Sequence, residues 1–273
     1  MFMLNSRTKR RGAGKTRALT AVVVAAVAVA FASACLKEQP AATDQTDDST
    51  AVRSTAKYVS TVDEGLGASI AILLDVSGSM QKSAGSDSRP KYIVAREALQ
   101  AMLETTDSFV ARQPGFPVNV GLYTFSSTVT RIVPIKPYNR LALSAALSTL
   151  GKPNGGTAIG DAMDVARQDL YSAGTIRKYI LVVTDGENTN GRAPDDVARE
   201  IATRSEGAVR QYFVAFDVDK AHFAFLKDVN GEVFGAANGV ALRAGLDSIY
   251  RGKILAEAMN AGETLPTPKK PKQ

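Results

Sequence analysis

The feature that most constrains this chain is an apolar run that ends in a carboxylate and two hydroxyls. Residues 68–74 read Ala-Ser-Ile-Ala-Ile-Leu-Leu, and Asp75, Ser77 and Ser79 follow them. A short run of apolar and β-branched residues before a glycine-containing break predicts a buried parallel strand and its exit loop. Ligands of open α/β sheets bind at the carboxyl ends of such strands. Hard oxygen donors of this kind are the ligands that Mg²⁺, Mn²⁺ and Ca²⁺ prefer.

Two further segments place polar side chains at comparable positions. Residues 179–184 predict a second buried strand, which Asp185 follows, and glycines 155–156 precede Thr157 where a helical pattern over 158–173 begins. The glycines permit positive φ or close backbone approach and leave the Thr157 hydroxyl free at the junction. Each hydroxyl alone could simply cap a helix. Together, three segments in this order favour a metal site made of Asp75, Ser77, Ser79, Thr157 and Asp185.

These motifs resemble the metal-ion-dependent adhesion site (MIDAS) of von Willebrand factor A (VWA) domains, and the resemblance extends over residues 66–258. It implies an α/β fold with a doubly wound, mostly parallel central sheet and helices on both faces. In the family, the Ser and Thr hydroxyls coordinate the cation directly, and at least one Asp acts through water. The resemblance therefore implies Mg²⁺, with Mn²⁺ or Ca²⁺ as other candidates, bound so that it captures an Asp or Glu carboxylate of a protein partner.

The alternation of strand and helix patterns supports the same α/β class. A polar loop is expected over 81–89, and prolines 90 and 194 each open a helical pattern. Asp217 and Asp219 are expected to be solvated loop carboxylates, and His222 a partly buried helix residue. The remaining strands are expected at 118–125, 128–135 (antiparallel), 211–216 and 232–236, and the remaining helices at 139–150, 222–229 and 239–259.

The N-terminal segment has a different character. Residues 1–34 contain six basic and no acidic residues before an apolar run over 18–34, which is the layout of a signal peptide. The only cysteine, Cys35, follows directly and resembles the acylated cysteine of a bacterial lipobox, although Ala32 stands where leucine is usual. A plain secretory signal or an uncleaved anchor are the alternatives, and all three export the domain.

Residues 35–65 and 259–273 are polar and lack apolar periodicity, which predicts a disordered tether and a disordered tail. The net charge of +6 equals the six basic residues of the first 34. The rest of the chain is neutral by count, so its charge does not indicate nucleic acid as a partner. The chain is therefore expected to be a lipoprotein anchored to the membrane in the bacterial cell envelope.

Two enzyme classes fit the sequence less well than a binding module does. A Mg²⁺-dependent phosphatase of the haloacid dehalogenase type needs a second Asp two residues after its nucleophile, where this chain has Ser77. A Ser–His hydrolase would have to use His222, the single histidine, and there is no G-x-S-x-G motif. A structural envelope protein with an unused metal site stays open. The sequence favours a non-enzymatic, cation-dependent protein-binding module.

Overall fold

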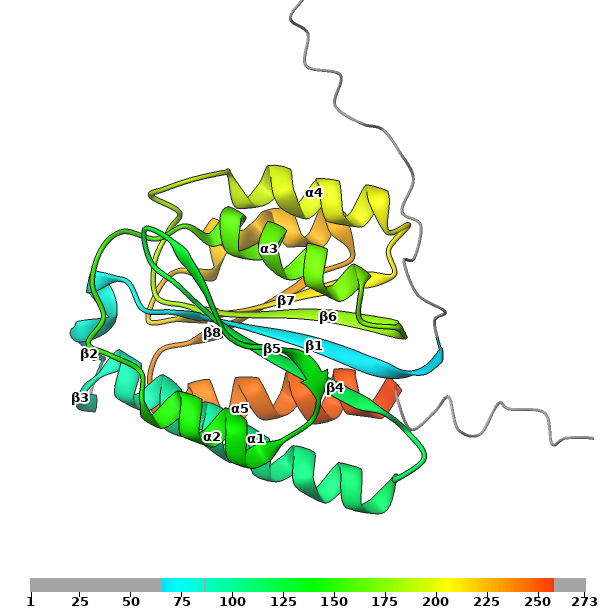
Figure 1. The fold of residues 1–273 in the computed structure, drawn as a ribbon. Coiled ribbons are helices and arrows are strands. Elements are labelled where there is room, and N and C mark those ends of the chain that lie inside the picture. The colour runs from blue at the N-terminus through cyan, green and yellow to red at the C-terminus, as the bar shows by residue number, and fades with distance from the viewer. Residues whose placement is uncertain (1–64, 86, 258–273) are drawn as a thin grey trace, which may run out of the picture. The chain divides into compact units, whose positions relative to one another are not determined.

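A six-stranded sheet lies between two layers of helices (Figure 1). The computed structural model describes residues 65–85 and 87–257. The strand order is β5-β4-β1-β6-β7-β8, and only the β4–β5 pair is antiparallel. The expected doubly wound, mostly parallel fold is confirmed. The strands are β1 (Gly65–Asp75), β4 (Val118–Phe125), β5 (Val129–Pro137), β6 (Thr175–Thr184), β7 (Val209–Phe216) and β8 (Glu232–Ala236).

The helices cover both faces of the sheet. The helices α1 (Lys91–Arg112), α2 (Arg140–Ser148) and α5 (Gly239–Ile249) lie on one face (Figure 1). The other face carries α3 (Ile159–Tyr171), α4 (Pro194–Arg204) and the 3₁₀ segment η2 (Lys220–Val229). Because both faces of the central strands are covered, their side chains are apolar in both directions, as a parallel sheet requires. Two separate apolar cores result, one on each side of the sheet.

The order in which strands are added to the sheet reverses at β1. From β1 it passes through α1 to β4 and β5 on one side, and it then returns to β6 on the other side of β1. This reversal of strand order lies at the carboxyl ends of β1 and β6. Open α/β sheets form their ligand crevices at such a switch point. The topology therefore places Asp75 and Asp185 at the position where a ligand site is expected.

Three expectations differ from the structure in detail. The polar loop expected at 81–89 contains a short hairpin of β2 (Ser83–Ala84) and β3 (Asp87–Pro90), after the 3₁₀ turn η1 (Gly78–Gln81). Strand β6 begins four residues earlier than residue 179, because the polar residues before it also pair with β1. The helix expected over 239–259 becomes a π-helix, η3, at Tyr250–Leu255.

The predictions for the signal peptide (1–34), Cys35, the tether and the tail fall almost wholly outside the described residues. Within residues 65–85 and 87–257, none of the helices has the length and apolar character needed to span a bilayer.

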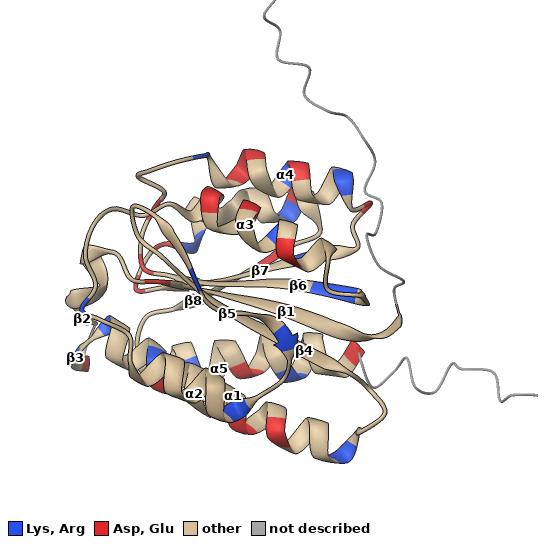
Figure 2. Cartoon of the chain, viewed as in Figure 1, with Lys and Arg blue, Asp and Glu red and all other residues tan. Residues whose placement is uncertain are grey.

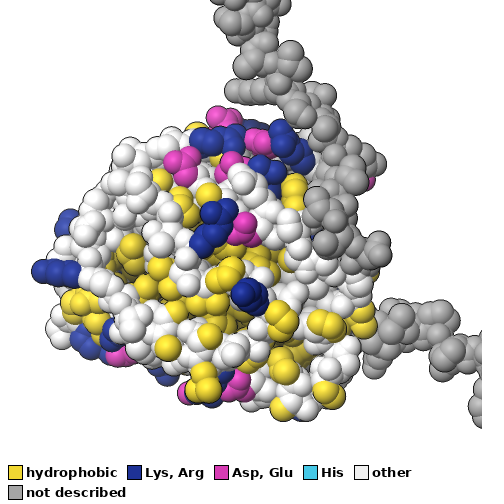
Figure 3. Space-filling view, viewed as in Figure 1, with side chains coloured by type: hydrophobic (Ala, Val, Ile, Leu, Met, Phe, Trp, Pro, Cys, Tyr) yellow, Lys and Arg dark blue, Asp and Glu magenta, His cyan; other side chains and the backbone are white. Residues whose placement is uncertain are grey.

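The surface combines charged helices with an apolar sheet edge. Acidic and basic residues alternate along the outer sides of α1 and α4 (Figure 2). Hydrophobic side chains gather over the edge strand β5, between the two helical layers (Figure 3). Partly buried residues of β5 supply part of this surface, namely Val129, Ile132, Val133 and Ile135.

Candidate metal centre

The two predicted metal carboxylates lie side by side at the ends of neighbouring strands. Asp75 is the last residue of β1, and Asp185 directly follows Thr184, the last residue of β6. The register pairs Leu74 with Val183, so Asp75 and Thr184 extend from the same level of the sheet. The Thr184 hydroxyl accordingly donates to Asp75 Oδ2 over 2.6 Å.

Main-chain hydrogen bonds tie the loop after β1 to the loop before α3. Gly78 N donates to Gly155 O over 3.0 Å, and Asn154 N donates to Val76 O over 2.9 Å. Gly155 has φ +80, a conformation that favours glycine because it lacks a Cβ. The glycine pair before the third motif therefore brings Thr157 towards the first motif.

The loop after β6 forms hydrogen bonds with both main-chain groups of Thr157, its N–H and its C=O. Thr157 N donates to Thr189 Oγ1 over 2.8 Å, and Thr157 O accepts from the main-chain N–H groups of Thr189 and Asn190. All three predicted segments are thus joined at one end of the sheet. The position of each predicted metal residue depends on contacts between loops that are distant in the sequence.

Three of the predicted side chains form a continuous chain of oxygens. Ser79 Oγ donates to Asp185 Oδ1 over 2.7 Å, and Ser77 Oγ lies 3.0 Å from Ser79 Oγ. Thr157 belongs to the same region: a Cβ placed on Gly186 would lie 3.9 Å from Ser79 Oγ and 4.0 Å from Thr157 Oγ1. Within residues 65–85 and 87–257, the hydrogen bonds of Thr157 involve only its main chain. Its buried hydroxyl thus faces the oxygen cluster without being committed to another described residue.

Asp75 is held behind this cluster. It is fully buried, and its two oxygens accept from Ser77 N over 2.7 Å and from the Thr184 hydroxyl. Burial raises the pKa of Asp75 to about 6, although the hydrogen bonds from Thr184 and Ser77 act in the opposite direction. At neutral pH this carboxylate is ionised in a place that disfavours its charge. A nearby cation would offset that cost.

The helix-capping alternative does not describe these hydroxyls. The N-cap of α3 is Ala158, and the first amide of the helix, Ile159 N, instead donates to Asn188 Oδ1 over 2.7 Å. The N-cap of η1 is Ser77, whose side chain accepts no capping hydrogen bond. Capping therefore does not account for the Ser79 and Thr157 hydroxyls.

Sequence reasoning missed a buried cation beside Asp185. Lys91 Nζ lies 3.0 Å from Asp185 Oδ2 and 2.9 Å from Asp217 Oδ2. Burial alone disfavours the ammonium, but its hydrogen bonds to Asp217 and Asp185 outweigh burial and raise the pKa of Lys91. Asp217 is exposed, as expected for a loop carboxylate, but it is also an ion-pair partner of Lys91. Asp219 instead caps η2 by accepting from Ala221 N.

The oxygen set fits a hard divalent cation. Two carboxylates and three hydroxyls from three loops converge, and these donor types suit Mg²⁺, Mn²⁺ and Ca²⁺. The described residues contain no cluster of three or more His, Cys, Asp or Glu side chains that could hold a metal. A cation here would therefore have to use the hydroxyls of Ser77, Ser79 and Thr157 together with Asp75 and Asp185.

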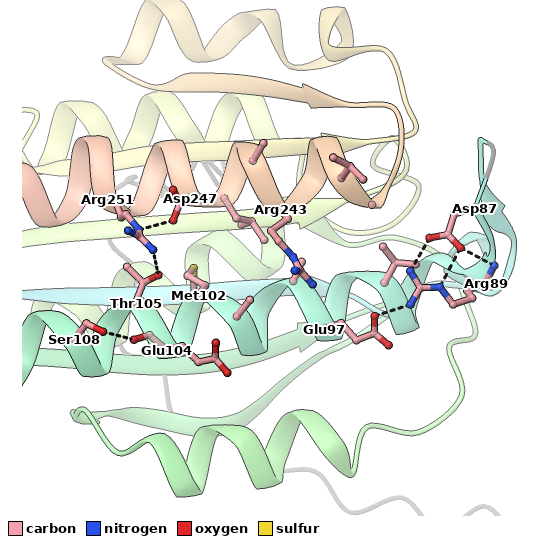
Figure 4. Close-up of a pocket in the computed structure, with 17 residues that line it drawn as sticks. Asp87, Arg89, Glu97, Met102, Glu104, Thr105, Ser108, Arg243, Asp247 and Arg251 are labelled. Carbon is pink, nitrogen blue, oxygen red and sulfur yellow. Dashed lines mark hydrogen bonds and ion pairs between the residues drawn. The ribbon is translucent and has the colours of Figure 1, made fainter.

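Two other surface features lie away from the oxygen cluster. A groove runs between α1 and α5, and five of its charged side chains pair within it: Arg89 with Asp87 and Glu97, and Arg251 with Asp247 (Figure 4). The single histidine, His222, is exposed rather than partly buried, and its Nδ1 lies 3.2 Å from Glu187 Oε1. Neither feature offers the free, convergent oxygens of the site at the strand ends.

Comparisons with known proteins agree with this architecture. Residues 70–187 match the family model of the von Willebrand factor type A domain. The PilB minor pilin from Streptococcus sanguinis has a TM-score of 0.59 at 15% identity, over 75% of this chain and 64% of that chain. A von Willebrand factor type A structure from Catenulispora acidiphila has a TM-score of 0.54 at 21% identity, over 70% and 46% of the two chains.

A third solved structure carries a metal. Proximal thread matrix protein 1 from the mussel byssus, with a zinc-occupied MIDAS motif, has a TM-score of 0.52 at 19% identity, over 73% of this chain and 48% of that chain. No curated protein sequence matches the chain significantly. The chain spans less than two thirds of the pilin, and identities this low show a common fold. Residues 70–187 thus match the von Willebrand factor type A model, and the chain shares the fold of these solved structures.

Proposed function

We propose that this chain is a cation-dependent protein-binding module of the bacterial cell envelope. Its metal residues are Asp75, Ser77, Ser79, Thr157 and Asp185, and Mg²⁺ is the expected ion, with Mn²⁺ or Ca²⁺ as substitutes. The observation that carries the proposal is the line of oxygens from Ser77 through Ser79 to Asp185, beside the uncommitted Thr157 hydroxyl. The mussel protein with its zinc-occupied MIDAS motif supports a metal at this place in the fold.

The donor set explains why such a site would bind a protein. Three of its five side chains are neutral hydroxyls, and at least one of the two carboxylates is expected to act through water, so the direct ligands of a bound dication carry less than two negative charges. A hard cation of this kind favours an additional anionic oxygen. We propose that an Asp or Glu carboxylate of the partner supplies that oxygen, and that the partner's carboxylate completes the coordination.

The environment of Asp75 argues against a hydrolase. A phosphatase nucleophile must present a free carboxylate oxygen to its substrate, whereas Asp75 is fully buried and both of its oxygens accept hydrogen bonds. Ser77, two residues later, cannot transfer a proton near neutral pH. We therefore propose that the site binds and does not break bonds.

Replacing the Thr157 hydroxyl tests the metal site directly. Thr157→Val keeps the shape of the side chain but removes an oxygen, so Mg²⁺ affinity measured by calorimetric titration should fall at least about tenfold. Thr157→Ser, the matched control, keeps the oxygen and should stay within about threefold of the wild type. Equal affinities for the valine and serine variants would show that Thr157 is not a ligand.

The partner is tested with the same pair of variants. Capture of a protein from envelope extracts should require Mg²⁺, disappear in EDTA, and be lost with Thr157→Val but not with Thr157→Ser. Once the partner is known, changing its bridging Asp or Glu to the amide should remove most of the affinity. Strong sensitivity to EDTA without any sensitive acidic residue in the partner would rule out carboxylate capture.

The proposed location rests on Cys35 and the basic, apolar segment before it, both outside the described residues. We propose that Cys35 is acylated and holds the domain at the membrane. One acyl chain gives only marginal membrane binding, and bacterial lipoproteins, which this segment resembles, carry several. Cys35→Ser should therefore move the protein to the soluble fraction or leave an uncleaved precursor. Processing and membrane partition like those of the wild type would contradict the lipid anchor.

A further inference from the structure

A buried lysine that is not one of the proposed ligands lies beside the candidate metal site. Lys91 is the first residue of α1, and its side chain is 7% exposed. Its ammonium lies 3.0 Å from Asp185 Oδ2 and 2.9 Å from Asp217 Oδ2. A buried charge is costly unless it is paired, so the two carboxylates are what make a buried ammonium tolerable at this position.

Both ends of this ion pair occupy positions that are locally unfavourable. The N-terminus of a helix carries partial positive charge, which repels a cation on the first residue. Asp217 has φ +56, a left-handed conformation that few non-glycine residues adopt, although Asp and Asn adopt it more often than most. Neither residue gains stability from its own local backbone. The contacts that link Lys91, Asp217 and Asp185 are therefore what stabilises this arrangement.

The two oxygens of Asp185 accept hydrogen bonds from two different donors. Oδ1 accepts the Ser79 hydroxyl, on the side of the proposed metal, and Oδ2 accepts the Lys91 ammonium. Lys91 is therefore separated from the hydroxyl cluster by a single carboxylate. Asp217, the second carboxylate in contact with the ammonium, is the third charge of this group.

We propose that Lys91 is a built-in counter-charge that weakens the hold of Asp185 on the cation, and that Asp217 limits this effect by sharing the ammonium. The inference rests on the proposed metal site and deepens it. A dication whose nearest carboxylate is already partly neutralised keeps more of its charge for an outside carboxylate. Lys91 is thus a positioning and charge-setting residue for partner capture, not a ligand.

This role gives opposite signs for the two ends of the ion pair. Removing Lys91 leaves Asp185 with its full charge, so the metal alone should bind more tightly. Removing the charge of Asp217 leaves the ammonium to Asp185 alone, so the metal should bind more weakly. If the pair merely held Asp185 in place, both changes would loosen the site and weaken metal binding.

The test is calorimetric titration of the full-length protein with MgCl₂ or MnCl₂ alone, with folding checked by circular dichroism. Lys91→Met should bind about tenfold more tightly than the wild type, and Asp217→Asn about threefold more weakly, as expected for one unit charge near a dication. Arg89→Met is the matched control, since it removes an exposed positive charge two residues away. Its affinity should change less than about twofold, because solvent screens exposed charges.

Lys91→Met could fail to fold, because it leaves Asp185 and Asp217 without their partner. The double variant Lys91→Met/Asp217→Asn removes both members of the pair, preserves the net charge, and should still bind the metal more tightly than Asp217→Asn. Equal or weaker binding by the folded lysine variants would overturn the inference while leaving the metal site intact. Absence of binding by the wild type would instead overturn the proposed function, and the inference with it.

Discussion

The Asp75→Asn protein is expected to be more stable than the wild type at pH 7 in EDTA, by about 2–3 kcal/mol, and to gain no stability from Mg²⁺. The wild type should show the reverse behaviour, with low stability in EDTA and a gain on adding metal. A ligand bound only by the native state stabilises by about 2.7 kcal/mol at a hundredfold excess over its Kd. The two proteins should therefore be about equally stable at that Mg²⁺ concentration, and the wild type should become the more stable one at a thousandfold excess, where its gain is about 4.1 kcal/mol.

The reason is the cost of a buried charge. Burial raises the pKa of Asp75 to about 6 from an ordinary value of 3.8, so at pH 7 the folded state holds an ionised carboxylate that is less stable there than in the unfolded chain. An amide can take the same place. Thr184 Oγ1 lies 2.6 Å from Asp75 Oδ2 and 3.2 Å from Gly186 O, so its proton can turn to Gly186 and let the amide donate.

The pH dependence has a definite sign. Between pH 3.8 and about 6 the folded state binds the Asp75 proton more tightly than the unfolded state does, so this group lowers stability as pH rises. The difference between Asp75→Asn and the wild type should be close to zero at pH 4 and reach its full size above pH 6. Urea unfolding of both proteins in EDTA from pH 4 to pH 8 measures it. A less stable Asp75→Asn protein at pH 7 would contradict the pKa and its cause.

The main elements of the fold follow from local patterns. Strand β4 occupies the expected residues 118–125, and β8 the expected residues 232–236. Apolar runs of this length, separated by glycine and proline, leave little choice in a chain of alternating strands and helices. The sequence pattern predicts too short a strand β6, because Arg177 and Lys178 are charged and resemble loop residues. Lys178 nevertheless lies buried in the strand, where its ammonium donates to Thr175 O.

The candidate site was only partly visible in the sequence. Its five residues have a recognisable spacing, but Lys91 and Asp217 do not, because Lys91 is 94 positions from Asp185 and the contact depends on how α1 crosses the ends of the strands. One local signal was present. A lysine directly after the proline that opens a helix is opposed by the helix dipole, and such a residue calls for an acidic partner. Only the folded arrangement shows which acidic residues pair with Lys91.

A second large effect is expected from Gly160→Ala, which should destabilise the protein by about 2–3 kcal/mol. In an isolated helix this change is favourable by about 1 kcal/mol, because glycine is a poor helix former. Here a Cβ on Gly160 would lie 2.1 Å from the carbonyl oxygen of Arg192, in the loop after β6. That oxygen also accepts from Asn188 Nδ2 over 3.1 Å, and Arg192 N donates to Asp161 Oδ1, so the loop has little freedom to retreat.

The displaced loop is the one that attaches to Thr157, so Mg²⁺ affinity should fall together with stability. Gly245→Ala is the matched control, because it makes the same change within α5, where the nearest atoms, on Phe234 and Val214, are 3.9 Å away. It should leave metal binding unchanged and stabilise the protein by up to about 1 kcal/mol. Urea unfolding and calorimetric titration of the two variants give both quantities. If Gly160→Ala behaved like Gly245→Ala, the close packing of α3 against the loop after Asp185 would not be what holds Thr157 at the metal site.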